Sequence, residues 1–457
     1  MAGLSDAHRS ALASLLSRCG EPVLKAVADA VARLPGPRAI ELRAMLSHET
    51  RDRRRRAYAF APLVPMFRPR PDGVPALTFP ADVLPRLWRL ASEREPDLLF
   101  RLDDPDEDEE AVAVAVANRI CQAAASIVRD RPELVWPADG DPAARETGLE
   151  ELAACLDLAH LARRALLSVE VWLKRPDGDQ LAELRLLVKD AAAIHADGAK
   201  RLLEILFAHL EDAVLVLRIV TRTSGAAGRE GFLSASELAD FVDRLLDGVA
   251  ARADRLAAYA PGPDADELRQ VVTDLDWCAN VLAELDVTLA LDPGSAWGRT
   301  AREARVKLGD WLAGLMRAAD RAVDKALPLT RVQLAGRMSR QAPLLTAPAR
   351  GEAADAALAL LRLVGAARGA TAVFGCEAAR RTLEETLQAR LTDYADQVLH
   401  MVNDGEAPDE AHALRLVGVA ARYLEEIDAR PAARTVRRRA AVAGGDSTGA
   451  GPSSQAA

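Results

Sequence analysis

The segment SASELADFVDRLLDGVAARADRLAAYAPGPDADE, from Ser234 to Glu267, decides the fold class. Ser234 with Glu237, and Asp264 with Glu267, match the capping box, in which the two side chains satisfy amide groups at the start of a helix. Between these pairs apolar residues recur at helical spacing, and APGPD at 260–264 breaks the pattern. The segment therefore predicts two amphipathic helices joined by a short loop.

The same pattern continues from residue 145 to 429, where amphipathic stretches alternate with short segments rich in Gly, Pro and Asp. Ala, Leu and Arg favour helix, whereas aromatic residues, at 4% of the chain, leave little for the core of a β-sheet. We therefore predict an all-α protein, either a multi-helix bundle or an irregular helical array. Residues 145–429 should form one helical body without sheet. HADG at 195–198 should interrupt a long helix there, with Gly198 as the residue that follows the first part.

A loop at 136–142, WPADGDP, is the expected domain boundary. It separates an N-terminal helical domain, residues 1–135, from the main helical domain, residues 145–429. From residue 430 the chain loses its apolar periodicity and turns to Gly, Ser and Ala, so 430–457 is predicted to be a disordered, mildly basic tail. Residues 436–457 are expected to be dispensable for folding.

One segment of the N-terminal domain differs from the rest of the chain: RRRRAYAFAPLVPMFRPRPDGVPALTFP, from Arg53 to Pro80. A helix that begins near Arg38 should run into these arginines. The prolines that follow lack an amide donor, so residues 58–80 are predicted to be a non-helical insert. RPDGV is a turn signal, and we expect short extended or polyproline arms beside it. The acidic run DDPDEDEE at 103–110 is predicted to be a solvated loop that leads into a helix.

This Arg- and Pro-rich segment is the expected site of partner binding, since its prolines would preorganise an arm whose arginines attract an acidic surface. That surface could belong to the run at 103–110 of the same chain or to a partner protein. The alternative is a helix end followed by a covering loop. If the arm hypothesis holds, exchanging all four consecutive arginines for Gln should leave the melting temperature nearly unchanged. The predicted partner-binding residues are Arg53, Arg54, Arg55, Arg56, Phe67, Arg68 and Arg70.

The charge of the chain bears on whether the protein binds nucleic acid. The net charge of −9 argues against a chain-wide nucleic-acid footprint, which is normally basic. A local phosphate or nucleic-acid site formed by Arg51–Arg56, together with Arg68, Arg70 and the basic tail, is the second hypothesis. Lys is rare compared with Arg and Ala is abundant, which is typical of GC-rich bacterial coding bias.

Catalytic signatures are missing from the sequence. It contains neither a P-loop nor a G-x-G-x-x-G motif, and its five cysteines are scattered without a C-x-x-C pair. Asp157 and His160 share a helix face, and together with His195 they are a candidate metal site, but bundle metal sites normally repeat E-x-x-H on two helices. Cys376 follows a glycine near a predicted helix start, where we favour a buried structural thiol.

We therefore expect a non-enzymatic, cytoplasmic scaffold or adaptor without cofactor or metal. It should bind other proteins through helical faces and the basic, Pro-rich arm. A helical metal-dependent enzyme is the third hypothesis. No stretch reaches the ~18 uncharged apolar residues of a membrane span, so no transmembrane segment is predicted.

Overall fold

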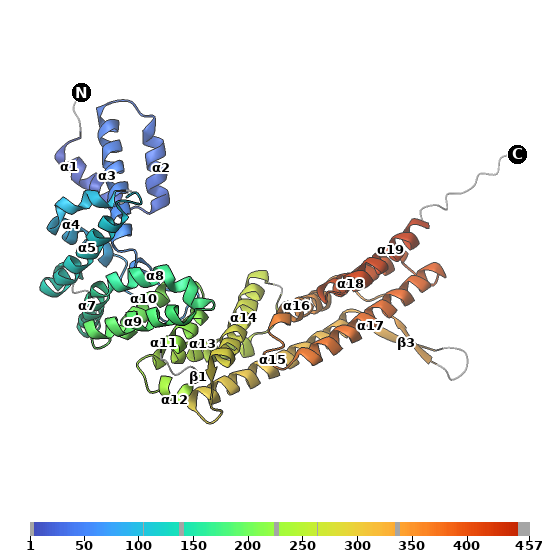
Figure 1. The fold of residues 1–457 in the computed structure, drawn as a ribbon. Coiled ribbons are helices and arrows are strands. Elements are labelled where there is room, and N and C mark those ends of the chain that lie inside the picture. The colour runs from blue at the N-terminus through green and yellow to red at the C-terminus, as the bar shows by residue number, and fades with distance from the viewer. Residues whose placement is uncertain are drawn as a thin grey trace. The chain divides into compact units, whose positions relative to one another are not determined.

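The all-α prediction is confirmed by a computed structural model, in which helices dominate (Figure 1). Strands are confined to two small two-stranded sheets in the described part of the chain. The structure describes these residues: 4–103, 105–136, 141–223, 228–262, 264–333 and 339–446.

The chain divides into two compact units by its internal contacts. The first comprises Met1–Ala227 and Phe232–Phe241, and the second comprises Gly228–Gly231 and Val242–Ala457. This division differs from the predicted boundary at 136–142. The reason is that the helices on either side of that loop, Glu110–Asp130 and Pro142–Asp157, pack against each other in one core.

The first unit is built from short and medium helices that follow one another closely in sequence. They are α1 (Asp6–Arg18), α2 (Glu21–Ala32), α3 (Pro37–Ala59), η1 (Val64–Phe67), α4 (Val83–Arg94), η2 (Pro96–Leu102), α5 (Glu110–Asp130), α6 (Pro132–Val135), α7 (Pro142–Asp157), α8 (Ala159–Leu173), α9 (Gly178–Ile194), α10 (Gly198–His209), η3 (Ala213–Leu215) and α11 (Val216–Thr223).

The second unit contains longer helices and the short strands. Its elements, with two helices that span the division of the chain, are β1 (Gly228–Arg229), α12 (Glu230–Leu233), α13 (Ala239–Ala258), α14 (Ala265–Thr288), β2 (Leu289–Ala290), α15 (Ala296–Ala326), β3 (Leu329–Gln333), β4 (Ser339–Pro343), α16 (Glu352–Ala366), η4 (Ala367–Gly369), α17 (Glu377–Asn403), α18 (Glu410–Glu426) and α19 (Arg430–Asp446).

Helices α1 to α3 enclose a small core of their own. Leu16 of α1, Leu24 and Val31 of α2, and Leu46 of α3 are buried together. Two features start the helices: the Ser5 hydroxyl caps α1, and Pro37 opens α3 after a glycine in the left-handed region. This local packing fixes one side of α3 and leaves its other side facing the rest of the unit.

The Pro-rich segment folds as a strap over the core, and we use this name for residues 60–82. Its apolar residues Phe60, Leu63 and Met66 are fully buried. Of the predicted extended or polyproline arms, the one before the turn is wrong, because its residues form the 3₁₀-helix η1, and the segment after the turn, 74–80, contains no strand. The predicted turn is confirmed: the Gly73 amide donates to Arg70 O at 3.2 Å, and Gly73 has a φ of 69°.

Polar contacts tie the strap to the end of α10. The His209 Nε2–H donates to Pro62 O at 2.8 Å, and the Arg70 guanidinium donates to the Phe207 carbonyl. Burial lowers the pKa of His209, which favours the neutral imidazole in this contact. The strap therefore joins α3 to a helix far along the chain, as expected of a covering loop.

The predicted break within 179–222 is confirmed, although its glycine has another role. Helix α9 ends at Ile194 and α10 begins at Gly198, so Gly198 opens the second helix instead of following the first. A Cβ at this position would lie 1.8 Å from Ala191 O. Glycine is therefore required by the close approach of two backbones.

Of the two predicted helix starts, the one at Asp264 is confirmed and the one at Ser234 is wrong. The Asp264 side chain caps α14 by accepting the amides of Asp266 and Glu267, as predicted. The start predicted at Ser234 is wrong, because α13 begins at Ala239. Residues 234–238 form turns instead, in which the Ser236 hydroxyl donates to Leu233 O and accepts from the Leu238 amide.

Two expectations for the C-terminal half are wrong. The body predicted to lack sheet contains the antiparallel hairpin of β3 and β4, because ladder pairs join 329–333 to 339–343. The tail predicted from residue 430 begins too early. Residues 430–446 form α19, which packs on α18 and buries Ala433 and Val436 completely or nearly so. The remainder of the predicted tail, 447–457, lies outside the described residues.

Helix α5 is long and apolar enough to cross a membrane by length and composition. Half of its most apolar window is buried inside the fold, and Ala117, Ile120 and Ala124 are completely buried. Such burial is typical of a core helix, and α4 and α7 both pack against it.

Candidate protein-binding groove

Arg53, the first of the four consecutive arginines, is a structural residue. Its Nη2 donates to Leu16 O at 2.7 Å and to Cys19 O at 2.8 Å, and its Nε donates to Glu49 Oε1 at 2.7 Å. The two carbonyls lie at the C-terminal end of α1, where helix carbonyls lack partners within the helix. The Arg53 side chain is only 13% exposed. It therefore caps α1 from α3.

We predict that Arg53→Gln lowers the free energy of unfolding by about 1.5–3 kcal/mol, because hydrogen bonds to a charged donor are lost. Arg51→Gln, which changes an exposed arginine of the same helix by the same charge, should stay within about 0.5 kcal/mol of the wild type. Urea unfolding followed by circular dichroism measures both. Equal effects of the two variants would contradict a structural role for Arg53. The earlier expectation of an unchanged melting temperature is thus revised for this residue.

Arg55 joins the basic run to the acidic run of the same chain. Its Nε donates to Asp103 Oδ1 at 2.7 Å, and its Nη2 pairs with Asp103 Oδ2. These hydrogen bonds lower the pKa of Asp103 and raise that of Arg55. Arg56 is partly buried, and burial, with the charge of Arg53 as a smaller cause, lowers its pKa. Part of the basic run is therefore neutralised internally.

The remaining predicted residues do not share one face. Phe67 is buried and packs on Phe79 with ring centroids 5.6 Å apart. Arg70 is buried in an ion pair with Asp72, whereas Arg68 is exposed. The predicted partner-binding residues therefore do not form a free arm, and three of them, Arg53, Phe67 and Arg70, hold α1 and the strap in place.

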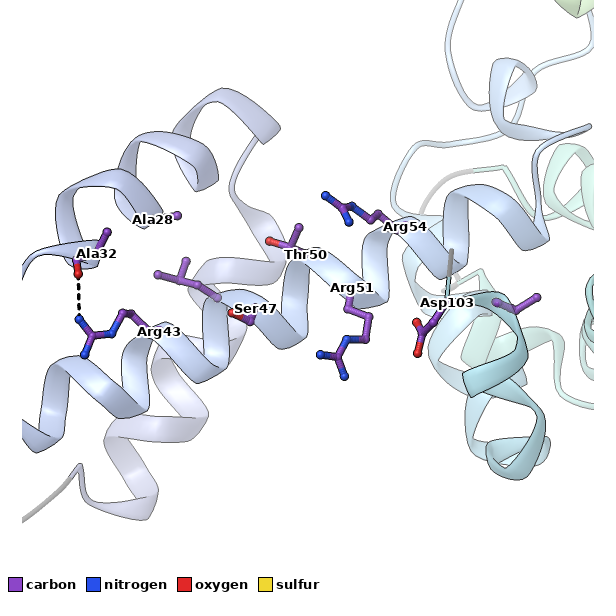
Figure 2. A pocket seen from close by; sticks show the side chains of 10 residues that line it. Ala28, Ala32, Arg43, Ser47, Thr50, Arg51, Arg54 and Asp103 are labelled. Carbon is purple, nitrogen blue, oxygen red and sulfur yellow. Dashed lines mark hydrogen bonds between the residues drawn. The ribbon is translucent and has the colours of Figure 1, made fainter. Parts of the chain in front are cut away.

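A groove lies instead along α3, on the side of Arg51 and Arg54 (Figure 2). Its volume is about 660 Å³. It is lined from α2, from α3 and from the end of η2. The lining residues are Ala28, Ala32, Arg43, Leu46, Ser47, Thr50, Arg51, Arg54, Leu102 and Asp103.

The floor of the groove is apolar and its rim is polar. Ala28 and Ala32 of α2 and the buried Leu46 and Leu102 supply the apolar surface. The Arg43 Nη1 donates to Ala32 O at 2.9 Å, which joins α3 to the C-terminal end of α2 (Figure 2). This contact holds the two walls of the groove at a fixed distance.

Arg51 and Arg54 give the groove its exposed positive charge. Both side chains are exposed and come from the middle of α3, next to Thr50 (Figure 2). The Arg51 charge contributes to the lowered pKa of Asp103, after the larger effect of Arg55. The sequence pointed to these arginines only as part of a run. The spacing of 43, 47, 50, 51 and 54 on one helix face is the signal that could have shown the groove.

The proposed metal ligands are brought together only in part. His195 Nε2 lies 2.9 Å from Asp157 Oδ2, but His160 Nδ1 faces the backbone oxygen of Asp157 at 3.0 Å. Arg129 pairs with the same Asp157 carboxylate. In the described residues, no group of three or more His, Cys, Asp or Glu side chains could hold a metal ion. The Asp157 carboxylate is instead shared by an arginine and an imidazole.

Cys376 is buried, and burial raises the pKa of its thiol. Its Sγ donates to Gly309 O at 3.4 Å. A thiol in such surroundings is a weak nucleophile, which agrees with the structural interpretation of this residue.

No protein-family model matches the sequence, and neither the curated proteins nor the solved structures give a significant match.

Proposed function

We propose that this protein is a non-enzymatic adaptor that binds an acidic, amphipathic helix of a partner protein in the groove along α3. The observation that supports this proposal best is the placement of two exposed arginines, Arg51 and Arg54, beside an apolar floor. An amphipathic helix in such a groove would place its apolar face on the floor and its carboxylates next to the arginines.

The dimensions of the groove favour a short helix. From Arg43 to Arg54 the lining residues of α3 span eleven steps along the helix, or about 16 Å at 1.5 Å per residue. A partner helix of about three turns has this length. Small side chains, Ala28 and Ala32, allow such a helix to approach α2 closely.

The hypothesis of phosphate or nucleic-acid binding requires Arg51–Arg56 to act as one cluster. Arg53 and Arg55 are instead engaged with Glu49, with carbonyls of α1 and with Asp103. These contacts favour a peptide over a nucleic acid.

To test the proposal, fluorescence anisotropy measures binding of a fluorescein-labelled peptide of about 14 residues, helical with Leu and Ala on one face and Glu on the other. Exchanging Arg51 and Arg54 together for Gln should weaken binding about tenfold or more, since charged contacts at the rim of the groove are lost. Arg38→Gln, on the same helix but outside the groove lining, is the matched control and should leave the affinity unchanged.

A second peptide, with Lys in place of every Glu, should not bind. If both peptides bind alike, or if Arg38→Gln weakens binding as much as the double exchange, the groove is not the site. Tighter binding of a DNA duplex than of the acidic peptide, lost in the double variant, would favour the phosphate hypothesis instead.

A further inference from the structure

The hairpin of β3 and β4 offers a second binding surface, in the C-terminal unit. Its register pairs Leu329 with Pro343, Arg331 with Gln341 and Gln333 with Ser339. The base of β4 is buried at Ala342 and Pro343, and β4 packs against α17. β3 is the other strand of this two-stranded hairpin (Figure 1).

One contact shows which residue pairs of the hairpin exchange backbone hydrogen bonds. The Leu344 amide donates to Pro328 O at 3.0 Å, in the same register as the strands. Because bonded and non-bonded pairs alternate in an antiparallel ladder, Thr330 and Val332 exchange bonds with β4. Leu329, Arg331 and Gln333 then direct their amide and carbonyl groups away from β4.

Among the described residues no third strand pairs with β3, so its outer edge is open and capable of pairing. None of its three outward residues is a proline, whereas Pro343 interrupts the outer edge of β4. The side chains of β3 are exposed except for the intermediate Thr330, and two of them are apolar: Leu329 is 43% and Val332 is 38% exposed. A two-stranded ribbon alone is marginally stable in water, so a third strand would add both hydrogen bonds and apolar contact.

The charge of β3 and β4 indicates which kind of strand would pair with the outer edge of β3. The two strands carry Arg331 and Arg340 and no acidic residue, although the whole chain has a net charge of −9. Two β3 strands of separate copies, paired about Arg331, would place like charges directly opposite each other, which is unfavourable. An acidic strand would instead place a carboxylate opposite Arg331.

We propose that β3 is a docking edge for an extended, acidic segment of a partner protein, which adds to the hairpin as a third strand. The backbone groups of Leu329, Arg331 and Gln333 supply the hydrogen bonds. Acidic side chains of the segment lie on the face of Arg331, and β-branched side chains lie on the opposite face, next to Val332. This site is independent of the groove along α3.

The test uses the full chain and a labelled probe peptide, Thr-Glu-Val-Glu-Val-Glu-Thr, with blocked ends. Arg331 and Gln341 are paired outward residues on opposite edges, so a proline at either position removes an outward amide and leaves the inner ladder bonds in place. We expect Arg331→Pro to weaken peptide binding about tenfold or more, and Gln341→Pro to leave it within about twofold of the wild type.

Arg331→Gln separates charge from backbone pairing, because it keeps the amide and removes the guanidinium. It should fall between the wild type and Arg331→Pro. Equal binding by the two proline variants, or no binding of the peptide to the wild type at millimolar concentration, would overturn the proposal. So would a wild-type dimer in sedimentation experiments that Arg331→Pro abolishes, because the occupant of the edge would then be a second copy of the chain.

Discussion

Replacing Arg70 with Met is expected to lower the free energy of unfolding by about 3–5 kcal/mol, the usual cost of removing one partner from a buried ion pair. The Arg70 side chain is 3% exposed. It donates to both Asp72 carboxylate oxygens, at 3.0 and 2.6 Å, and its guanidinium carbon lies 4.2 Å from the centroid of the Phe207 ring. Met can fill much of the volume, but it removes both hydrogen bonds that Arg70 donates to the Asp72 carboxylate.

Two backbone amides also hold the Asp72 carboxylate in place. Its oxygens also accept the amides of Val74 and Ala213, at 3.1 and 3.2 Å, which fix the carboxylate where it is. Arg68→Met is the matched control, because Arg68 lies on the same strap with an exposed side chain. It should change stability by less than about 0.5 kcal/mol. Urea unfolding followed by tryptophan fluorescence measures both variants, and similar small losses for the two would contradict a structural role for Arg70.

Replacing Gly298 with Ala is expected to destabilise the protein by about 2–4 kcal/mol, although Ala usually favours helix. The new Cβ would lie 1.9 Å from Asp292 O and 3.2 Å from Pro293 Cα. Overpacking of this kind costs about 1–3 kcal/mol. The Gly298 amide also donates to the Ser295 hydroxyl at 2.9 Å, and loss of this cap adds about 1 kcal/mol.

The turn before α15 cannot easily move aside, because the Asp292 amide donates to Glu230 Oε2 at 2.6 Å and the adjacent β2 pairs with β1. Gly418 is the control: it is exposed within α18, and a Cβ there would meet nothing within 4 Å. Gly418→Ala should stabilise by about 0.5–1 kcal/mol. Thermal melts should therefore move in opposite directions for the two variants, and a higher melting temperature for Gly298→Ala would refute the close approach.

Local signals in the sequence predicted several helix boundaries and one turn. Such features depend mainly on residues that are close together in the sequence. The Asp264 cap, the break before Gly198 and the turn at Gly73 are of this kind. The start predicted at Ser234 failed, since residues 234–238 form turns and the helix begins only at Ala239.

The role of Arg53 and the formation of α19 depend on tertiary contacts, so they could not be predicted from the sequence. Arg53 and Arg54 are adjacent and chemically identical, yet only the position of α1 makes Arg53 a capping residue. Helix α19 was missed because its sequence lacks apolar periodicity and leads into an end rich in Gly and Ser. Burial of Ala433 and Val436 on α18 supplies the contacts that an isolated segment of this composition would lack.

The strap has a consequence for the synthesis of this protein on the ribosome. Its bond from Arg70 to Phe207 joins residues 137 positions apart, whereas α1 to α3 contact one another locally. At 5–20 residues per second, the end of α10 follows the strap by roughly 7–27 s. Throughout that interval η1 lacks the part of its surroundings that α10 supplies in the finished fold. The nascent chain therefore presents an apolar segment next to its arginine run, a combination suited to chaperone binding until α10 emerges.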